Sequence, residues 1–207
     1  MTHSNKWRIG TFFTVDTPYQ QVYYDYLEKS CKKFNIQPWF MITENYHSWY
    51  RNVAEKPKAI LNMLNENEKD VCLVFLDADA TIEQHPTLFD EIPEEYDIAY
   101  HTLNWNEWYG YKAQRPVMEL LTGTMFFRNN NKVKKLCQEW YEKAIETNTW
   151  EQKVLQKIIK NHNLKIYDLP LEYCYMKSRP RNQEPLVKLD PIILHHQVSR
   201  ELKRKLL

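Results

Sequence analysis

The sequence predicts an α/β fold in which a central, mostly parallel sheet is flanked by helices. Apolar, strand-like runs alternate with amphipathic, helix-like segments through the first half of the chain. The run from Val71 to Leu76 is apolar throughout, which is typical of a strand buried on both faces of a parallel sheet. The chain has 207 residues, 43% of them hydrophobic and 27% charged, and these values predict one globular domain.

The first strand and the first helix occupy the N-terminal part of the chain. The strand is expected over residues 7–14. Asp16 or Thr17 then caps a helix that has Pro18 near its first turn, where the fixed backbone angle of proline suits a helix. Apolar residues recur at spacings of three and four as far as Phe34, which predicts one buried helix face.

The later elements follow the same two patterns. A second strand is expected over residues 38–42, and Pro57 begins a helix that leads to the strand at 71–76. Thr149 and Gln152 have the spacing of a capping box at a helix start. The other expected elements are strands at 98–101 and 121–127, helices at 133–145 and 150–159, short strands at 164–168, 171–175 and 192–194, and a basic segment at 199–207.

The composition excludes two common ways of binding a nucleotide. A Rossmann fingerprint or a Walker loop needs glycines clustered in one short loop, and the three glycines here, Gly10, Gly110 and Gly123, lie far apart. A bound phosphate must therefore be met by side chains or by a metal ion. The 28 Lys and Arg residues balance 27 Asp and Glu residues, so the chain lacks the strong basic field of a typical nucleic-acid-binding protein.

The cysteines and the N-terminus indicate the expected compartment. Cys31, Cys72, Cys137 and Cys174 are far apart and form no C-x-x-C pair, so we expect buried, reduced thiols. The N-terminal residues lack the apolar core of a signal peptide, and no apolar run has the length of a membrane span. The expectation is a cytoplasmic protein without a membrane span.

Two aspartates follow directly after the apolar strand at 71–76. Asp77 and Asp79 are separated by one residue, so on an extended chain they point the same way, at the sheet edge where α/β proteins bind ligands. Two carboxylates side by side repel each other unless a cation neutralises them, and oxygen ligands suit Mg²⁺ or Mn²⁺. The simpler alternative is that one aspartate caps the turn and the other is solvated.

A second interpretation of the same segment is a phosphatase site. The residues from Asp77 to Thr81 fit the D-x-D-x-T pattern of haloacid-dehalogenase-like phosphatases, in which the first aspartate is a nucleophile and the second a general acid or base. In that family the motif normally follows the first strand, whereas two expected strands precede Asp77 here. No second acidic pair follows downstream, since Asp97, Asp168 and Asp190 are isolated. The phosphatase remains the alternative function.

Four segments in order resemble a GT-A glycosyltransferase, similar to glycosyltransferase family 8 and related nucleotide-diphospho-sugar transferases. They are the D-x-D pair after a βαβαβ half, the Gly-Thr strand at 122–128, the acid-Gln pair at 151–152, and a His after the late apolar run at 192–194. One departure is the segment after His195, which lacks the Gly and the Lys-Pro-Trp that are common in family 8. The resemblance implies a single GT-A-like domain over 1–207, with a nucleotide-binding half at about 1–80 and an acceptor half and C-terminal metal- and phosphate-binding segment at about 81–207.

The resemblance also implies a metal site and a sugar donor. Asp77, Asp79 and His195 would hold a divalent cation, Mn²⁺ or Mg²⁺, that binds the diphosphate of a nucleotide diphosphate sugar. The sugar donor implied by the resemblance is a UDP-sugar. A neutral imidazole suits Mn²⁺ better than Mg²⁺. His196 is the alternative ligand, because the register of the late strand is open.

The remaining site residues are implied in the same way. Thr11, Phe12 and Thr14 at the end of the first strand would contact the nucleotide, together with Lys56. Asp79 and the pair Glu151 and Gln152 would be catalytic, with retention of the anomeric configuration. In the basic C-terminal segment, Arg200 and Lys203 are candidates for contact with the diphosphate. Tyr19 is a candidate for stacking on the base, but its place on the apolar helix face favours core packing. The structural alternatives for the others are surface exposure for Lys56, helix capping for Gln152 and a solvated basic tail for Arg200 and Lys203.

An aromatic segment at 101–111 is expected to be a long loop on the acceptor side. Its Trp105, Trp108, Tyr109 and Tyr111 would suit stacking on a sugar or on a flipped base, although rings that merely pack over the donor are the alternative. The acceptor itself stays open between a carbohydrate, a protein hydroxyl and a hydroxymethylated DNA base. The hypotheses to test are thus a metal-dependent glycosyltransferase, a metal-dependent phosphatase and a non-catalytic nucleotide-sugar-binding module.

Overall fold

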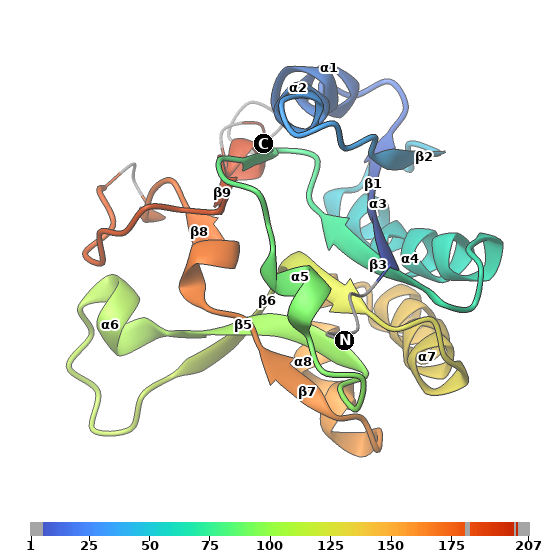
Figure 1. The fold of residues 1–207 in the computed structure, drawn as a ribbon. Helices are drawn as coiled ribbons and strands as arrows, with labels where there is room; N and C mark the ends of the chain where they lie inside the picture. The colour runs from blue at the N-terminus through green and yellow to red at the C-terminus, as the bar shows by residue number, and fades with distance from the viewer. Residues whose placement is uncertain (1–5, 181–182, 201, 203–207) are drawn as a thin grey trace.

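The computed structural model describes residues 6–180, 183–200 and 202, and its centre is a six-stranded sheet (Figure 1). The strand order is β2-β1-β3-β6-β5-β7. The strands are β1 (Lys6–Thr14), β2 (Trp39–Thr43), β3 (Val71–Leu76), β5 (Ile98–Asn104), β6 (Met118–Phe127) and β7 (Ile166–Asp168). Only β6 among these six runs antiparallel to its neighbours, so the sheet is mostly parallel, as the sequence predicts.

Helices cover both faces of this sheet. On one face lie α4 (Glu55–Glu66), α7 (Asn131–Thr147) and α8 (Glu151–Ile158); on the other lie α1 (Tyr19–Tyr23), the π-helical turn η1 (Tyr24–Glu28), α2 (Lys29–Lys32) and α5 (Leu88–Glu91). The side chains of β3 alternate between the two faces, with Phe75 on the first and Val74 on the second, and both are fully buried. This two-sided burial is why all six residues of β3 are apolar.

A small second sheet brings the C-terminal part of the chain back to the end of β3. It consists of β4 (Ala80–Ile82), β9 (Ile193–His195) and β8 (Tyr175–Met176), in the order β4-β9-β8. β4 and β9 are antiparallel, and Ala80 pairs with His195. Because β4 begins directly after Asp79, this pairing places His195 beside the two aspartates in space, although the residues are far apart in the sequence.

The aromatic segment is more regular than expected. β5 continues to Asn104, and the next residues form the short helix α6 (Trp105–Tyr109) instead of a loop. The Asn104 side chain caps α6 by accepting a hydrogen bond from the Asn106 N–H, and Gly110 ends it with a positive φ of 71°. In Figure 1, α6 lies at the tip of an arm that projects from β5 and β6. The prediction of a long irregular loop is therefore wrong.

Three further expectations need correction. The loop before the second long helix contains the helix α3 (Trp49–Val53), which Ser48 caps. The expected strand at 171–175 is the 3₁₀ turn η3 (Leu171–Tyr173) followed by β8, and α8 continues into the 3₁₀ turn η2 (Ile159–Asn161). Thr149 forms no capping box, because its hydroxyl donates to the Thr147 carbonyl and the Gln152 side chain is engaged elsewhere.

The cysteines agree with the expectation of buried thiols. All four cysteines are buried and free. Within the described residues, no helix is both long enough and apolar enough to cross a membrane.

Candidate active site

The aspartate pair lies where β3 leaves the sheet. The Asp77 N–H still donates to the Gly123 carbonyl of β6 at 2.9 Å, and the Ala80 N–H donates to the Asp77 carbonyl in the turn that follows. The Asp79 side chain is buried and accepts a hydrogen bond from the Val198 N–H at 2.8 Å. Burial and the neighbouring Asp77 carboxylate raise the pKa of Asp79 to about 6. The Asp79 carboxylate therefore lacks the hydration that it would have at the surface.

Three residues form a cluster that suits a divalent cation. Asp77, Asp79 and His195 each offer one ligand atom, and these atoms all lie within 4.8 Å of one another. Two carboxylate oxygens and an imidazole nitrogen form a donor set for Mn²⁺ or Mg²⁺, with the imidazole favouring Mn²⁺. The structure thus brings together the three residues implied as metal ligands by the resemblance.

His195 is suited to ligation by its surroundings. Its side chain is 2% exposed, and its Nε2 lies 2.8 Å from the Thr124 hydroxyl. Burial, followed by the charge of Lys56, lowers the pKa of His195 to about 3, so the imidazole is neutral at neutral pH. The ring packs against Gly123, where a Cβ atom would meet Cε1 at 2.8 Å. The absence of a side chain at Gly123 therefore lets the His195 ring approach the backbone of β6 closely.

His196 lies elsewhere. Its Nε2 is 3.0 Å from the Thr81 hydroxyl, and its ring packs on Tyr26 with ring centres 4.4 Å apart. Consecutive residues of an extended strand point in opposite directions, so only one of the two histidines faces the aspartates. That residue is His195.

A buried ammonium links the aspartate pair to helix α8. Lys56 Nζ lies 2.9 Å from Asp77 Oδ1 and 2.8 Å from Glu151 Oε1, and it donates to the Thr122 hydroxyl at 3.2 Å. Burial alone would lower the pKa of Lys56, but the two carboxylates outweigh it and the net shift is upward. Lys56 is 5% exposed, so the simpler expectation of a surface lysine is wrong.

Glu151 and Gln152 form the first turn of α8 and face the sheet. Both are buried, and the Trp140 indole N–H holds the helix start by donating to the Glu151 carbonyl at 2.8 Å. Gln152 Oε1 accepts from the Thr122 N–H at 3.2 Å, and Gln152 Nε2 donates to Glu119 at 2.9 Å. Lys56, which contacts both Glu151 and Asp77, joins the start of α8 to the cluster of Asp77, Asp79 and His195.

The residues implied as nucleotide contacts on β1 form few polar contacts with the rest of the protein. Thr11 is fully buried, and its hydroxyl has no hydrogen-bond partner among the described residues. Phe12 packs against Phe75, with ring centres 6.2 Å apart, and the Thr14 hydroxyl lies 3.5 Å from that of Thr43.

Tyr19 and the C-terminal segment complete the surroundings of the aspartates. Tyr19 packs against the core as expected, and burial, Asp79 and Asp77 raise its pKa, which places the phenol beside the aspartates. The Arg200 guanidinium donates to the Ser178 carbonyl at 2.9 Å. Lys203, implied as a diphosphate contact, lies outside the described residues.

The aromatic residues of α6 differ from one another. Trp108 is 1% exposed and packs edge-on against Tyr175, with ring centres 5.4 Å apart. It belongs to the core, so its expected role as an exposed stacking surface is wrong. Trp105, Tyr109 and Tyr111 form a cluster of partly accessible rings with centres 5.4–5.8 Å apart, and Tyr111 is 52% exposed.

Glu119 is a buried residue of this region that sequence reasoning missed. It lies on β6, three residues before Thr122, and contacts Gln152, Lys153 and Trp105. The expected strand begins only at residue 121, so Glu119 falls outside it. A carboxylate inside an apolar strand is a usable signal, because such groups are buried only when they are paired.

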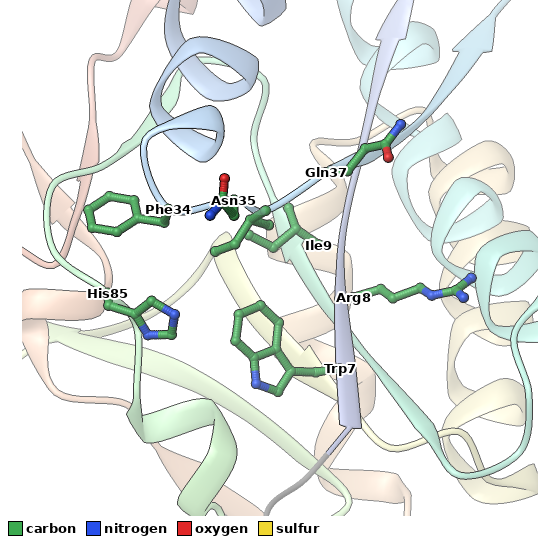
Figure 2. A pocket seen from close by; sticks show the side chains of 8 residues that line it. Trp7, Arg8, Ile9, Phe34, Asn35, Gln37 and His85 are labelled. Atoms are coloured by element: carbon green, nitrogen blue, oxygen red, sulfur yellow. The ribbon is translucent and has the colours of Figure 1, made fainter.

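A surface pocket lies away from these residues. It has a volume of about 360 Å³ and is lined by residues that include Trp7, Phe34 and His85 (Figure 2). Trp7 lies near the start of β1, and Asp77 follows the end of the parallel strand β3, so the pocket and the aspartates lie at opposite edges of the sheet. The carboxylates and the imidazole described above therefore make the strand ends near Asp77 the candidate active site, and not this pocket.

Three solved structures of glycosyltransferases are similar in fold to this chain. One is a glycosyltransferase involved in the glycosylation of the major capsid of PBCV-1, with a TM-score of 0.66, 13% identity, and coverage of 97% of this chain and 99% of that chain. Another is the galactosyltransferase LgtC in complex with donor and acceptor sugar analogues, with a TM-score of 0.55, 11% identity, and coverage of 92% and 87%. A third is mouse xyloside xylosyltransferase 1, with a TM-score of 0.53, 9% identity, and coverage of 94% and 98%. At these identities, the likeness establishes the fold.

A comparison with sequence-family models identifies the family. A search of curated protein sequences gives no match. The model described as nucleotide-diphospho-sugar transferase matches residues 19–207, which is most of the chain and includes the aspartate pair, the acid-Gln pair and His195. The chain therefore belongs to the nucleotide-diphospho-sugar transferase family and has the GT-A glycosyltransferase fold.

Proposed function

We propose that this glycosyltransferase is metal-dependent and transfers a sugar from a UDP-sugar to a hydroxyl group. The observation that carries the proposal is the convergence of Asp77, Asp79 and His195, whose ligand atoms lie within 4.8 Å of one another. Three glycines spread along the chain supply no backbone cradle for a diphosphate. A cation held by these three residues meets that need.

The chemistry of the transfer explains the donor set. When the bond between the anomeric carbon and the diphosphate breaks, negative charge develops on the leaving phosphate. A divalent cation stabilises that charge and orients the diphosphate when it is bound. We propose Mn²⁺ in preference to Mg²⁺, because His195 is buried and neutral and imidazole is a softer ligand than oxygen.

The other implied residues fall into two groups around this cluster. We propose that Thr11, Phe12, Thr14 and Lys203 contact the nucleotide from the half formed by residues 1–80 and from the C-terminal segment. Lys56 has a different role from a simple surface contact, because its ammonium already holds Asp77 and Glu151. We propose that it holds both carboxylates in place beside the diphosphate.

Glu151, Gln152 and Asp79 are the proposed catalytic residues. Glu151 and Gln152 begin α8 and both contact Thr122, and Glu151 shares Lys56 with Asp77. We propose that the Gln152 amide oxygen lies next to the anomeric carbon and that Glu151 holds a sugar hydroxyl, with retention of configuration. The acceptor would bind on the side of Trp105, Tyr109 and Tyr111, whose rings suit a carbohydrate face.

Calorimetric titration with UDP tests the metal requirement. We expect UDP to bind more tightly with Mn²⁺ than with a chelator, and Asp79→Asn to abolish the difference, because an amide keeps the shape of the ligand and loses its charge. Asp70→Asn is the matched control, because this exposed aspartate lies just before β3, at the strand end opposite Asp77. Equal affinity with Mn²⁺ and with chelator in the unaltered protein would contradict the proposal.

Slow hydrolysis of the donor separates the three classes of function. A glycosyltransferase without acceptor releases UDP and free sugar from a UDP-sugar. A phosphatase releases inorganic phosphate from a simple aryl phosphate, and a binding module does neither. Release of phosphate without hydrolysis of any UDP-sugar would establish the phosphatase alternative.

A further inference from the structure

We infer that Glu119 is a positioning residue that holds the Gln152 side-chain amide in one orientation. The inference rests on the proposed function for its catalytic consequence, since it concerns the presentation of Gln152 to the sugar donor. Glu119 itself lies on β6 and, through its hydrogen bonds, joins helix α6 to the start of α8.

Three hydrogen-bond donors converge on the Glu119 carboxylate. Oε1 accepts from Gln152 Nε2 at 2.9 Å and from Lys153 Nζ at 2.9 Å. Oε2 accepts from the Trp105 indole N–H at 2.7 Å. Glu119 is only 6% exposed, so these three partners replace the water that the carboxylate would bind at the surface.

The orientation of the Gln152 amide follows from the character of its two neighbours. A carboxylate only accepts hydrogen bonds, and a backbone N–H only donates them. The Gln152 NH₂ group must therefore face Glu119, and its oxygen must face the Thr122 N–H at 3.2 Å. A flipped amide would place two acceptors together at Glu119 and two N–H donors together at Thr122. Glu119 and Thr122 thus specify the same orientation independently.

This orientation directs the Gln152 oxygen toward the sugar-donor side of the site. Thr122, which the oxygen faces, also accepts a hydrogen bond from Lys56, and Lys56 contacts Asp77. The Gln152 NH₂ group faces the opposite way, toward Glu119 and Trp105. Without Glu119, the NH₂ group loses its buried acceptor, and the amide keeps only the contacts of its oxygen with the Thr122 N–H at 3.2 Å and the Thr122 hydroxyl at 3.3 Å.

Lys153 provides a matched control, because it shares Glu119 Oε1 with Gln152 but is 39% exposed. Lys153→Met removes the ion pair of Glu119 and leaves its hydrogen bond with Gln152. If Glu119 acts through Gln152, this variant keeps the amide orientation. If Glu119 acts only as a partner in an ion pair, Lys153→Met should have the same effect on the Gln152 amide as the Glu119 variants.

The first measurement reads the contact without any substrate. In ¹⁵N-labelled protein, the side-chain NH₂ signals of Gln152 are identified by their loss in Gln152→Ala. We expect Glu119→Ala to move these signals and Lys153→Met to leave them in place. Signals that do not move in Glu119→Ala would overturn the inference.

The second measurement reads the catalytic consequence as a double-mutant cycle. The turnover number for UDP release from UDP-glucose and UDP-galactose is compared in Glu119→Ala, Gln152→Ala and the double variant. We expect Glu119→Ala to lower turnover by about 10- to 100-fold, with the Kd for UDP unchanged, because a misplaced group beside the reacting carbon loses that much rate. In the Gln152→Ala background, the same change should have no further effect. Equal losses in both backgrounds would show that Glu119 does not act through Gln152.

A second variant covers a failure of Glu119→Ala to fold. Glu119→Gln keeps the shape but has one NH₂ group, which must face either Trp105 or the pair Gln152 and Lys153, all of them hydrogen-bond donors. We expect it to lower turnover, and Trp105→Phe added to it to restore turnover, because the NH₂ group then meets no donor. Absence of this rescue would count against the inference. Unaltered protein that hydrolyses neither sugar nucleotide would contradict the proposed donor, and the NMR measurement would still decide the Glu119 contact.

Discussion

Replacement of Gly123 by alanine tests the proposed metal site of Asp77, Asp79 and His195 without changing any of these three residues. The added Cβ atom would lie 2.8 Å from His195 Cε1, 3.0 Å from Nδ1 and 3.3 Å from Nε2. Contact with three ring atoms at once means that a simple ring rotation does not relieve the clash. His195 is buried and hydrogen-bonded to Thr124, so the ring must move as a unit or β6 must shift.

The size of the effect follows from these distances. Cε1 must retreat by about 0.6 Å before it reaches ordinary van der Waals contact with the new methyl group. Metal–ligand distances tolerate deviations of only about 0.2 Å, so this displacement would remove His195 from the coordination sphere of the proposed cation. We expect the Mn²⁺-dependent gain in UDP affinity to fall at least about tenfold. Overpacking should also lower the free energy of unfolding by about 1–3 kcal/mol, or Tm by about 2–12 °C.

The assay is calorimetric titration of UDP at several Mn²⁺ concentrations, together with thermal unfolding. Gly10→Ala is the matched control, because a Cβ there would lie 2.5 Å from Met63 Sδ and 2.7 Å from Leu73 Cδ1, far from His195. Gly10→Ala should lower Tm and keep the metal dependence. Metal-dependent UDP binding that survives in Gly123→Ala would refute the assignment of His195 as a ligand.

Three further predictions concern residues around the site. Lys56→Met should lower the free energy of unfolding in urea by about 3–5 kcal/mol, since it leaves a buried carboxylate unpaired; a loss below about 1 kcal/mol would show that the ion pairs contribute little. Trp108→Ala should destabilise the protein by about 3–5 kcal/mol, while Tyr111→Ala should leave Tm nearly unchanged, and equal melting curves would contradict this contrast. His195→Ala should weaken the Mn²⁺ dependence of UDP binding and His196→Ala should not; the reverse result would reassign the ligand.

Local patterns in the sequence were sufficient for much of the fold. The apolar run at Val71–Leu76 coincides with β3, because a strand buried on both faces admits no polar residue. Asp77 and Asp79 were placed at the sheet edge by this strand alone. The amphipathic helices at 131–147 and 151–158 were found from their periodicity. These features depend on residues that are neighbours along the chain.

Other features depended on contacts between distant parts of the chain. The choice of His195 over His196 required the register of β9 against β4, which decides the side of a strand on which each residue lies. Lys56 and Trp108 look like surface or loop residues in the sequence, but the fold buries both. The hydrogen-bond donors to Glu119 lie on α6 and α8, up to 34 residues away in the sequence, so its role is visible only in the folded structure.

The physical reason is the range of the interactions. Hydrophobic periodicity and strand-end positions are determined by the few residues of one element, and these specified the α/β architecture and the aspartate pair. Burial of charge, hydrogen-bond partners and side-chain orientation are determined by elements that meet only after folding. The tertiary structure therefore decided which imidazole joins Asp77 and Asp79, and which carboxylate orients Gln152.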